Sequence, residues 1–445
     1  MGDEGLYAYA SSLFAKGIVP YRDFFHSHPP AELLLLTPFT MLFGYSPTLL
    51  NAIPLSASIL TGVLLFFLAK REWGTLAGCI ACASFLFSTR NLQHALHFTG
   101  WNEATAFTVL GVFFLSGGKS LSAGIAAGIG TMFSIVAAVP SFILFLFTIS
   151  QSRRNALRFL GGFLATLFIL QIPFLLVAGT DYVQQVYLFH LFKNPEGVGG
   201  LPFITLFLAF VREHLFLVVG TILACTLPLL LKSASRKQST GALWWLSFCM
   251  IAGIGGFFLL LARPFPQYFL ILTPFLALLT AWSFAAAVQL WKEGRPALSM
   301  SLLTIFFCLA VLSTLRAGTG FIRSTSSPQG DFQIGYDIAK YLQEKTPPSG
   351  TLYGDFGIAP TVALLSGRRI AAHELESTPM RFDAGGESFG DVIAALEADG
   401  LMVILSSPQS MMRSFPPFTD YLTENFILEA VFKDGGEVVE VWAKK

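Results

Sequence analysis

The residues best suited to chemistry lie in the opening segment, "MGDEGLYAYASSLFAKGIVPYRDFFHSHPP". It holds an acidic pair, Asp3 and Glu4, and further on a tyrosine, an arginine and two histidines (Tyr21, Arg22, His26 and His28). A carboxylate can accept a proton as a general base, and the planar fork of an arginine matches phosphate oxygens. Carboxylate and imidazole groups together can also hold a divalent ion. The segment therefore offers groups for proton transfer, phosphate binding and metal binding.

Composition indicates the surroundings in which these groups work. Hydrophobic residues make up 54% of the 445 residues and charged residues only 12%, with a mean hydropathy of +0.64. Apolar stretches of this extent need lipid as their solvent. The net charge of +1 argues against a nucleic-acid partner, because phosphate backbones require a basic surface. The sequence thus predicts a multi-pass membrane protein with the lipid bilayer as a partner.

The apolar stretches that must position the site form a bundle. About ten crossings are predicted, at 48–69, 75–89, 101–117, 120–136, 138–150, 157–178, 214–231, 241–262, 267–288 and 297–315. Several are shorter than the roughly 20 residues that a straight span needs. All five cysteines lie inside apolar stretches, which favours packing over a disulfide framework or a zinc site. We expect residues 48–318 to be the transmembrane bundle, preceded by an outer loop with an interfacial helix at 1–47.

Charge orients the bundle. Eleven basic residues fall on alternate connections, which the positive-inside rule assigns to the cytoplasm; they are Lys70, Arg71, Lys119, Arg153, Arg154, Arg158, Lys232, Arg236, Lys237, Lys292 and Arg295. The opposite side keeps four, Arg90, Lys193, Arg212 and Arg263, with the acids Glu32, Glu103, Asp181, Glu196 and Glu213. The opening segment, the loops on that side and the C-terminal tail are therefore expected to share one extracytoplasmic face.

The C-terminal part has a different pattern. "DFQIGYDIAKYLQEKTPPSGTLYGDFG" reads as an amphipathic helix, a break and a short strand, and "DVIAALEADGLMVILSS" as a helix and a buried strand. The terminal "FILEAVFKDGGEVVEVWAKK" reads as two strands joined by a turn. We predict a small α/β domain at 319–445, which acts as a soluble cap on the outer face, because it carries no phosphate loop or nucleophile elbow.

The opening motif resembles a known family. The pattern D-E-G-x-Y, then G-x-x-P-Y-R-D-F-F and H-P-P before a Leu-rich helix, is similar to the first outer loop of GT-C class glycosyltransferases, the bacterial protein mannosyltransferase and aminoarabinose transferase type. "RPFPQYFLILTPFLALL" at 263–279 looks like a late segment of the same family. Members begin with a complete membrane helix before the acidic pair, so the resemblance implies that a first helix is missing here.

The resemblance implies a function and a site. The expected activity is transfer of a sugar from a polyprenyl-phosphate carrier to a lipid, glycan or protein acceptor at the outer face of the cell (inner) membrane. The family's leading catalytic acid maps onto Asp3, with Glu4 beside it. The leaving phosphate needs cationic stabilisation on the same face, for which Arg263 is the first candidate and Arg22 and Arg90 follow. Expected positioning residues are Tyr21, His28, His97, Glu103 and Tyr268.

Two questions stay open at this stage. A divalent ion held by Asp3 and His28 could assist the departing phosphate, yet the histidine spacing matches no established ligand motif, and His28 before Pro29-Pro30 could instead fix the loop's exit into a helix. The class of protein is also open, since a lipid or sugar transporter or flippase, or an inactive scaffold, would be polytopic too. A transporter should carry mid-span ionisable residues and internal repeats, and neither is visible.

Overall fold

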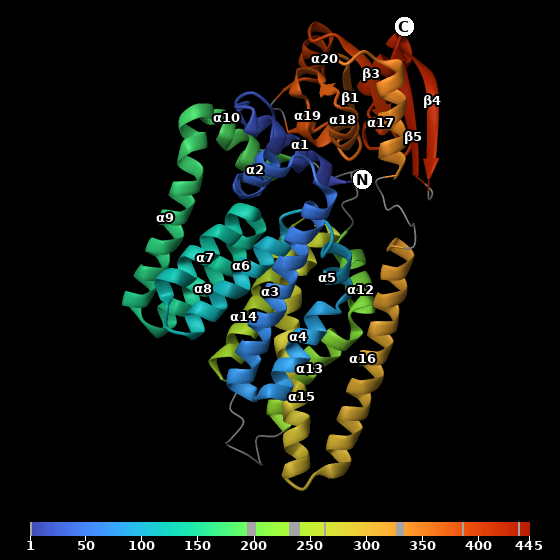
Figure 1. Cartoon of the computed structure of the whole chain (residues 1–445). Helices are drawn as coiled ribbons and strands as arrows, with labels where there is room; N and C mark the ends of the chain where they lie inside the picture. Colours follow the sequence, from blue (N-terminus) through green and yellow to red (C-terminus); the bar gives the residue numbers. More distant parts are fainter. Residues whose placement is uncertain are drawn as a thin grey trace. The chain divides into compact units, whose positions relative to one another are not determined.

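The computed structural model of the chain (Figure 1) describes residues 2–193, 202–230, 241–261, 264–325, 333–384, 387–434 and 437–445. The chain forms two compact units. Unit 1 combines Met1–Pro47, Leu170–Gly199 and Thr325–Lys445, and unit 2 combines Thr48–Ile169 and Gly200–Ser324. The opening segment and the C-terminal part of the sequence thus belong to one unit, together with a stretch from the middle of the chain.

Unit 2 is helical. Its helices, some of which extend past the unit's limits, are α3 (Pro47–Trp73), α4 (Thr75–Leu86), α5 (Thr89–His94), α6 (Trp101–Ser116), α7 (Ser120–Phe133), α8 (Ala138–Gln151), α9 (Arg153–Ala178), α12 (Phe203–Glu213), α13 (Leu215–Leu230), α14 (Ala242–Leu260), α15 (Thr273–Lys292) and α16 (Pro296–Thr325), with the short helical turns η1 (Ile135–Ala137) and η3 (Pro266–Leu272). Each of the ten predicted apolar segments contains a helix. The helical, polytopic fold class is confirmed.

Helix length limits the number of crossings. Among the described residues, five helices are long and apolar enough to span a membrane, or six if the pair α12 and α13, bent by 94°, counts as one span. Helices α4 and α7 have 12 and 14 residues, which at about 1.5 Å per residue is shorter than the roughly 30 Å hydrocarbon layer. The predicted count of ten crossings therefore exceeds what the helix lengths support.

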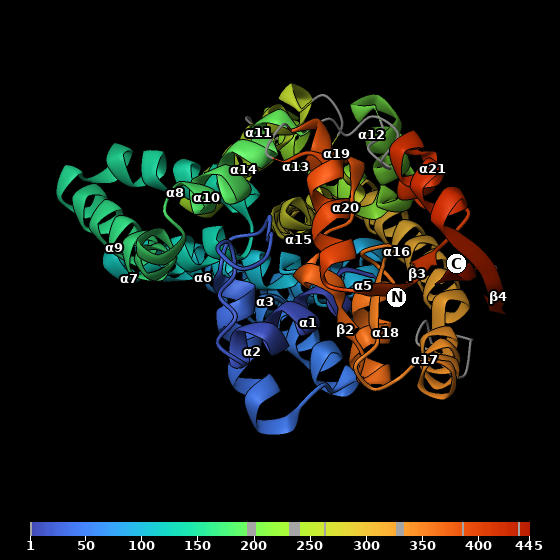
Figure 2. The same cartoon turned by 90° about the horizontal axis from the view of Figure 1, so that it is seen from above.

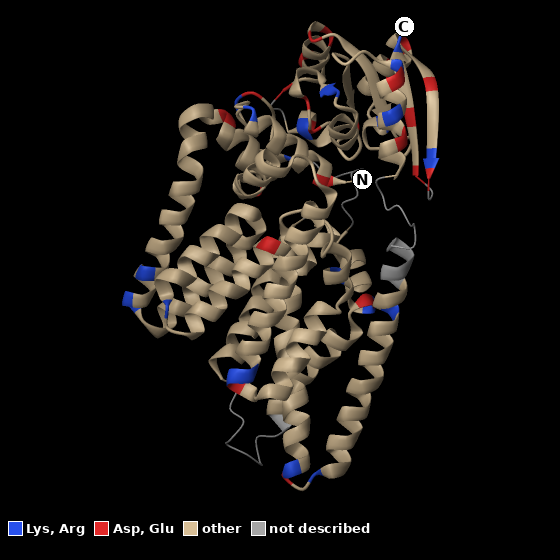
Figure 3. Cartoon of the chain, viewed as in Figure 1, with Lys and Arg blue, Asp and Glu red and all other residues tan. Residues whose placement is uncertain are grey.

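Small residues let the helices of unit 2 approach closely. A Cβ added at Gly124 of α7 would collide with the backbone carbonyl of Phe159 on α9, and one at Gly220 of α13 with Thr280 on α15. Ser283 of α15 donates a hydrogen bond to the Gly220 carbonyl at 2.8 Å. Such contacts hold helices together in lipid, where apolar burial gives no advantage. Figure 3 shows Lys and Arg of this unit at the turns where α3 meets α4, α8 meets α9 and α15 meets α16, with others near α5, α12 and α16.

Unit 1 contains a five-stranded sheet with helices. The order is β2-β1-β3-β5-β4, with β1 parallel to β2 and β3, and β5 antiparallel to β3 and β4. The strands are β1 (Thr351–Gly354), β2 (Arg369–Ile370), β3 (Leu401–Ser406), β4 (Phe426–Asp434) and β5 (Glu437–Lys444), and the helices nearest to them in sequence are α17 (Gln333–Lys345), α18 (Ala359–Ser366), α19 (Pro379–Asp383), α20 (Phe389–Ala398) and α21 (Pro416–Asn425), with the turns η5 (Ala371–His373) and η6 (Met412–Ser414). The predicted pairs of elements are confirmed as α17 and β1, α20 and β3, and β4 and β5, whereas α18, β2, α19 and α21 were not predicted.

The opening segment, predicted to be an outer loop with an interfacial helix, begins with a helix. Helix α1 (Asp3–Ala15) packs on α18, and Figures 1 and 2 both show the two side by side. Leu6 and Leu13 share a core with Val362, and Tyr9 accepts a hydrogen bond from the backbone N–H of Ile370 at 2.9 Å. The sequence before α2 (Ala31–Phe43) was read as a loop because its apolar side is short, and its partner surface lies far along the chain.

The remaining part of unit 1 is the stretch between α9 and the undescribed residues that follow it. It consists of α10 (Thr180–Val183), a π-helical turn η2 (Gln184–Leu188) and α11 (Phe189–Phe192). A π-helical turn is rare and is frequently found at functional sites. The side chains of this stretch reach the loop that joins α1 to α2, as the site geometry shows.

Candidate active site

The loop between α1 and α2 is held in one conformation by Tyr21. This residue has a left-handed backbone, with φ of 69°, which is uncommon for a side chain of its size. Its hydroxyl donates to the carbonyl of His28 at 2.8 Å. The side chain of Gln185, in the π-helical turn, accepts from the His26 N–H at 2.9 Å and donates to the Tyr21 carbonyl at 2.9 Å. The predicted positioning residues Tyr21 and His28 therefore do lie together.

A carboxylate from the C-terminal part of the chain completes this loop. Glu376 is buried and accepts two hydrogen bonds from Ser27, from the N–H at 2.8 Å and from the hydroxyl at 2.6 Å. His26 Nδ1 lies 3.6 Å from the Glu376 carboxylate, and His190 Nε2 lies 2.8 Å from the Ser27 carbonyl oxygen. Two segments that are distant in sequence, those of His190 and Glu376, thus converge on residues 26–28.

Aromatic contacts join α1 to the same place. The Tyr7 ring packs edge-on against the rings of His28 and His26, with centroids 5.3 and 6.3 Å apart. Asp3 precedes Tyr7 by four residues on α1, so both lie on one face of the helix. We call Tyr7, His26, Ser27, His28, His190 and Glu376 the histidine cluster. Asp3 lies at its edge.

Burial determines the protonation of these groups. It raises the pKa of Asp3 to about 6, helped by the neighbouring Glu4, and raises that of Glu376 to about 7 against the lowering effect of its Ser27 hydrogen bonds. Burial lowers the pKa of His28 to about 3, with a further contribution from Lys193, and that of His26 well below its usual range. The imidazoles are therefore neutral at pH 7, whereas Asp3 can take up or release a proton close to that pH.

A cation also belongs to this region. Burial lowers the pKa of Lys193 to about 8, and the charge of Glu376 opposes this effect. Its ammonium group lies 5.5 Å from the centre of the Phe189 ring. Lys193 was assigned only to the outer face by sequence, because a single lysine at the end of an apolar stretch has no motif that marks it.

The two remaining sequence candidates in unit 1 are placed differently. Arg22, predicted to bind phosphate, forms an ion pair with Asp23 at 2.7 Å, and its side chain is 48% exposed. Its guanidinium is therefore already neutralised by the next residue, which sequence spacing alone did not reveal. Glu4 is buried in the first turn of α1, so the acidic pair has one buried residue and one, Asp3, that is only half-buried.

A cavity of about 610 Å³ lies beside the histidine cluster. Tyr21 and Gln185 line it from the loop and the π-helical turn, and Arg381 of α19 lines it from the C-terminal part. All of its lining residues belong to unit 1. We refer to it below as the unit 1 cavity.

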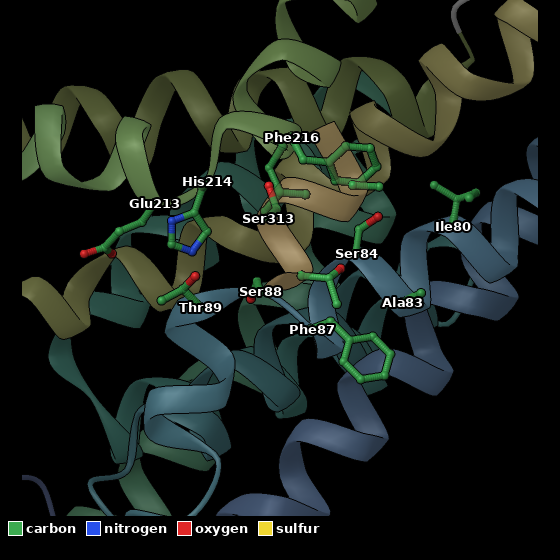
Figure 4. A pocket seen from close by; sticks show the side chains of 13 residues that line it. Ile80, Ala83, Ser84, Phe87, Ser88, Thr89, Glu213, His214, Phe216 and Ser313 are labelled. Carbon is green, nitrogen blue, oxygen red and sulfur yellow. The ribbon is translucent and has the colours of Figure 1, made fainter. Parts of the chain in front are cut away.

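In unit 2, Arg90, which was predicted to bind phosphate, interacts with other residues of the protein. Its guanidinium pairs with Glu213 at 3.0 Å, and its backbone N–H donates to His214 Nε2 at 3.3 Å. Glu213 and His214 line a pocket of about 140 Å³, in which Figure 4 shows them, with Thr89, on one side and the apolar Ile80 on the other. Arg90 thus fixes the bend between α12 and α13, a role that explains its burial without a phosphate.

The other unit 2 candidates gather at the start of α6. Glu103 is 3% exposed, and neither carboxyl oxygen has a hydrogen-bond partner among the described residues. Tyr268 stacks at a tilt on Trp101, with centroids 4.8 Å apart. His97, half-buried, lies just before α6. Arg263, the first candidate for phosphate binding, lies outside the described residues. The roles proposed for these residues remain predictions.

A metal ion finds no ready ligand set. In the described ranges, no group of three or more His, Cys, Asp or Glu side chains is arranged to hold one. The Glu376 oxygens are both used by Ser27, and no contact between Asp3 and His28 supports the predicted pair. We therefore derive no step through a metal.

The two units comprise a bundle of apolar helices and a small C-terminal sheet domain, a fold also found in solved structures of GT-C glycosyltransferases. No family model matches the chain, and no curated protein matches it. Solved structures do. ArnT from Cupriavidus metallidurans bound to undecaprenyl phosphate is 15% identical with a TM-score of 0.61, and the match covers 99% of this chain and 93% of that one.

Two structures of the Archaeoglobus fulgidus oligosaccharyltransferase share the fold as well. The form tethered to an acceptor peptide is 12% identical with a TM-score of 0.57, covering 100% of this chain and 70% of the other. The form in complex with an inhibitory peptide and a dolichol-phosphate is 13% identical with a TM-score of 0.53 and the same coverage. At these identities the likeness shows the fold.

Proposed function

We propose that this protein is a membrane glycosyltransferase that moves a sugar from a polyprenyl-phosphate carrier to a lipid, glycan or protein acceptor. The observation that carries the proposal is the place of Asp3, a half-buried carboxyl whose pKa is raised to about 6 and whose charge acts on Tyr7 and Glu376 of the buried histidine cluster. The shared fold supports it, because the similar ArnT structure is bound to undecaprenyl phosphate and the oligosaccharyltransferase to a dolichol-phosphate.

The proposed step is a displacement at the sugar's anomeric carbon. Asp3 accepts the proton of the acceptor's hydroxyl or amide group as that atom bonds to the anomeric carbon. The bond between this carbon and the phosphate oxygen breaks, and its electron pair leaves with the phosphate. The family resemblance favours inversion at the carbon. The negative charge on the leaving phosphate needs a cation, for which Lys193 and Arg263 are our candidates.

The proposal also includes the membrane and the side of it on which the reaction takes place. The cell (inner) membrane is the proposed location, with unit 1 on the extracytoplasmic side, because the basic residues fall on the connections that alternate along the chain with those on the side of the opening segment and the C-terminal part. One similar structure is a complex with Zn and sulfate, so dependence on a divalent ion is a property to measure by chelation and metal addition.

The direct test is transfer itself. Membranes containing the full-length chain are supplied with radiolabelled polyprenyl-phosphate sugars, and the lipid, glycan and protein fractions are examined for label. Label in one of these fractions from a polyprenyl-phosphate donor supports the proposal. Transfer from nucleotide sugars alone, with none from any lipid-linked donor, contradicts it, and movement of the lipid-linked sugar across the membrane without transfer indicates a flippase.

A further inference from the structure

The unit 1 cavity has the size and walls of a ligand site that the proposed chemistry does not yet use. Its volume of about 610 Å³ lies within the roughly 300–1,000 Å³ of typical small-molecule sites. Its lining comes from the loop after α1, from the segment containing α10, η2 and α11, and from residues around α19. Three parts of the chain build it, so it is a property of the folded unit.

The charges of the cavity exclude one kind of ligand. Two arginines face four carboxylates in its lining, Asp23, Asp181, Glu374 and Glu387. Neither arginine is available to an anion: Arg22 pairs with Asp23, and the buried Arg381 is held between Glu374 and Glu387. The excess of carboxylates disfavours an anionic ligand and favours groups that donate hydrogen bonds, such as hydroxyl or ammonium groups.

The apolar part of the lining is mainly aromatic. Phe25 packs edge-on against Phe189, with centroids 5.6 Å apart, and the Arg381 guanidinium lies 4.4 Å from the centre of the Phe25 ring. Phe192 lines the cavity while 65% exposed. A sugar ring combines a C–H face, which packs on aromatic rings, with hydroxyl groups at its edge, which donate to carboxylates and amides. This mixture of rings and acceptors fits a sugar better than a purely apolar ligand.

Two residues that line the cavity also form hydrogen bonds with the backbone of the histidine cluster. Tyr21 lines the cavity and its hydroxyl binds the His28 carbonyl. Gln185 lines the cavity and binds the backbone of His26. A ligand in the cavity therefore lies one layer of side chains away from the groups beside Asp3.

We propose that the unit 1 cavity binds the acceptor of the transfer reaction, and that this acceptor presents a sugar bearing hydroxyl or amino groups and no phosphate or carboxylate. The description of the ligand as an acceptor rests on the proposed function. The description as a site for a non-anionic sugar rests on the lining alone, and it is tested without any donor.

The test measures binding of three disaccharides to the purified full-length chain in detergent. The probes are a β-1,4-linked glucosamine disaccharide, the matching glucose disaccharide and a disaccharide containing glucuronic acid. Binding of each probe is measured by saturation-transfer NMR and by calorimetry. We expect the glucosamine probe to bind most tightly and the glucuronic acid probe at least about tenfold more weakly, with a difference that shrinks as salt is added. Equal or tighter binding of the anionic probe, or no binding of any probe, overturns the inference.

The variants for this test change exposed residues, so that a loss of binding is not caused by a failure to fold. Phe192→Ala and Asp181→Asn change exposed residues of the lining and are expected to weaken the glucosamine probe by about fivefold or more. The matched controls are Leu191→Ala, 75% exposed and outside the lining, and Asp420→Asn, exposed on α21, which should leave binding unchanged. If Phe192→Ala and Leu191→Ala behave alike, the cavity is not the site.

The two proposals fail in distinguishable ways. Sugar binding that responds to Phe192→Ala in a chain that transfers nothing from any lipid-linked donor contradicts the proposed function and leaves the sugar site standing. Transfer that proceeds normally in Phe192→Ala and Asp181→Asn, across a range of acceptor concentrations, contradicts the acceptor site and leaves the transferase standing. In the acceptor case we expect the variants to raise KM for the acceptor and to change kcat little.

Discussion

Ser27 donates both its backbone N–H and its hydroxyl to Glu376, at 2.8 and 2.6 Å, across 349 residues of sequence. The loop that carries His26 and His28 is therefore anchored by a residue of the C-terminal part, which the sequence presented only as a cap. Removal of either partner leaves a buried polar group unpaired, which typically costs about 1–3 kcal/mol. The C-terminal part of unit 1 thus takes part in building the site.

Replacement of Glu376 by Gln is expected to change how stability depends on pH. Burial raises the pKa of Glu376 from 4.5 to about 7 in the folded chain, so the folded state holds this proton more tightly than the unfolded state. The stability linked to this proton is complete below about pH 4.5 and is lost as pH rises through about 7, by up to about 3 kcal/mol. Gln stays neutral, and its amide can donate to the Ser27 hydroxyl.

The measurement is the thermal unfolding temperature of the full chain in detergent at about pH 5 and about pH 8. Glu376→Gln should lose less stability than the wild type between these values. The exposed Glu344→Gln on α17 serves as the control and should follow the wild type. Parallel pH curves for wild type and Glu376→Gln would show that this carboxyl does not titrate as described.

Asp3→Asn is expected to lower transfer by on the order of 100-fold or more, the scale of a general base, with donor binding and expression close to wild type. Asp3→Glu should recover little, because one extra methylene moves the carboxylate by about 1 Å. Since the pKa of Asp3 is about 6 and the base must be ionised, the wild-type rate should fall as pH drops below about 6. Initial rates across pH check this.

Glu4→Gln is the matched control for Asp3, because it changes the neighbouring acid of the same helical turn. If Asp3→Asn retains activity and Glu4→Gln loses it, the catalytic acid lies in the predicted pair but is the other residue. If both variants are fully active, the opening residues have no catalytic role.

Gly5→Ala is expected to weaken the docking of α1. A Cβ at this position would collide with the Thr361 hydroxyl on α18, and overpacking of this kind typically costs about 1–3 kcal/mol. The double variant Gly5→Ala, Thr361→Ala should recover part of the loss, since the colliding oxygen is removed. Gly17→Ala is an unsuitable comparison because its φ is 85°; Gly161→Ala, which meets nothing within 4 Å, is the better control. Equal unfolding temperatures for all four chains would contradict the close approach.

Reporter fusions test the orientation. A reporter after Arg154 should be active in the cytoplasm, and one after Lys345 should be active only outside it, because the basic residues at the start of α9 lie on the side that the positive-inside rule retains. A cytoplasmic reporter after Lys345 would overturn the proposed location of unit 1, and with it the shared compartment of Asp3 and the outer loops.

The elements of the fold were largely readable from sequence. The ten apolar stretches and the pairs α17 and β1, α20 and β3, and β4 and β5 follow from hydrophobic periodicity, which is a local property. The number of membrane crossings could not be read from the sequence. The stretch that forms α4, for example, is apolar enough to look like a span, yet its helix has only 12 residues. Helix ends depend on packing against neighbours, and this information is spread over distant parts of the chain.

The site was predicted in part. Tyr21 and His28 do lie together, because they sit in one short loop that the family resemblance marked. Glu376 and Lys193 were missed, since their importance comes from residues more than 150 positions away. Arg22 and Arg90 pair with Asp23 and Glu213 respectively, and their roles in phosphate binding stay predictions; the pairing of Arg90 with Glu213, 123 positions away, is not visible in the sequence.

The assembly of unit 1 has a consequence for biosynthesis. Helix α1 is made well before its partner surface, since the Ile370 N–H that binds Tyr9 belongs to a residue made 361 positions later. Until α18 and Ile370 have been made, the apolar side of α1 has no partner, and Asp3 lacks its folded surroundings. Chains that stop before residue 370 should therefore be sensitive to proteases within α1, and quality control that detects this exposed helix would in effect report whether synthesis had passed that point.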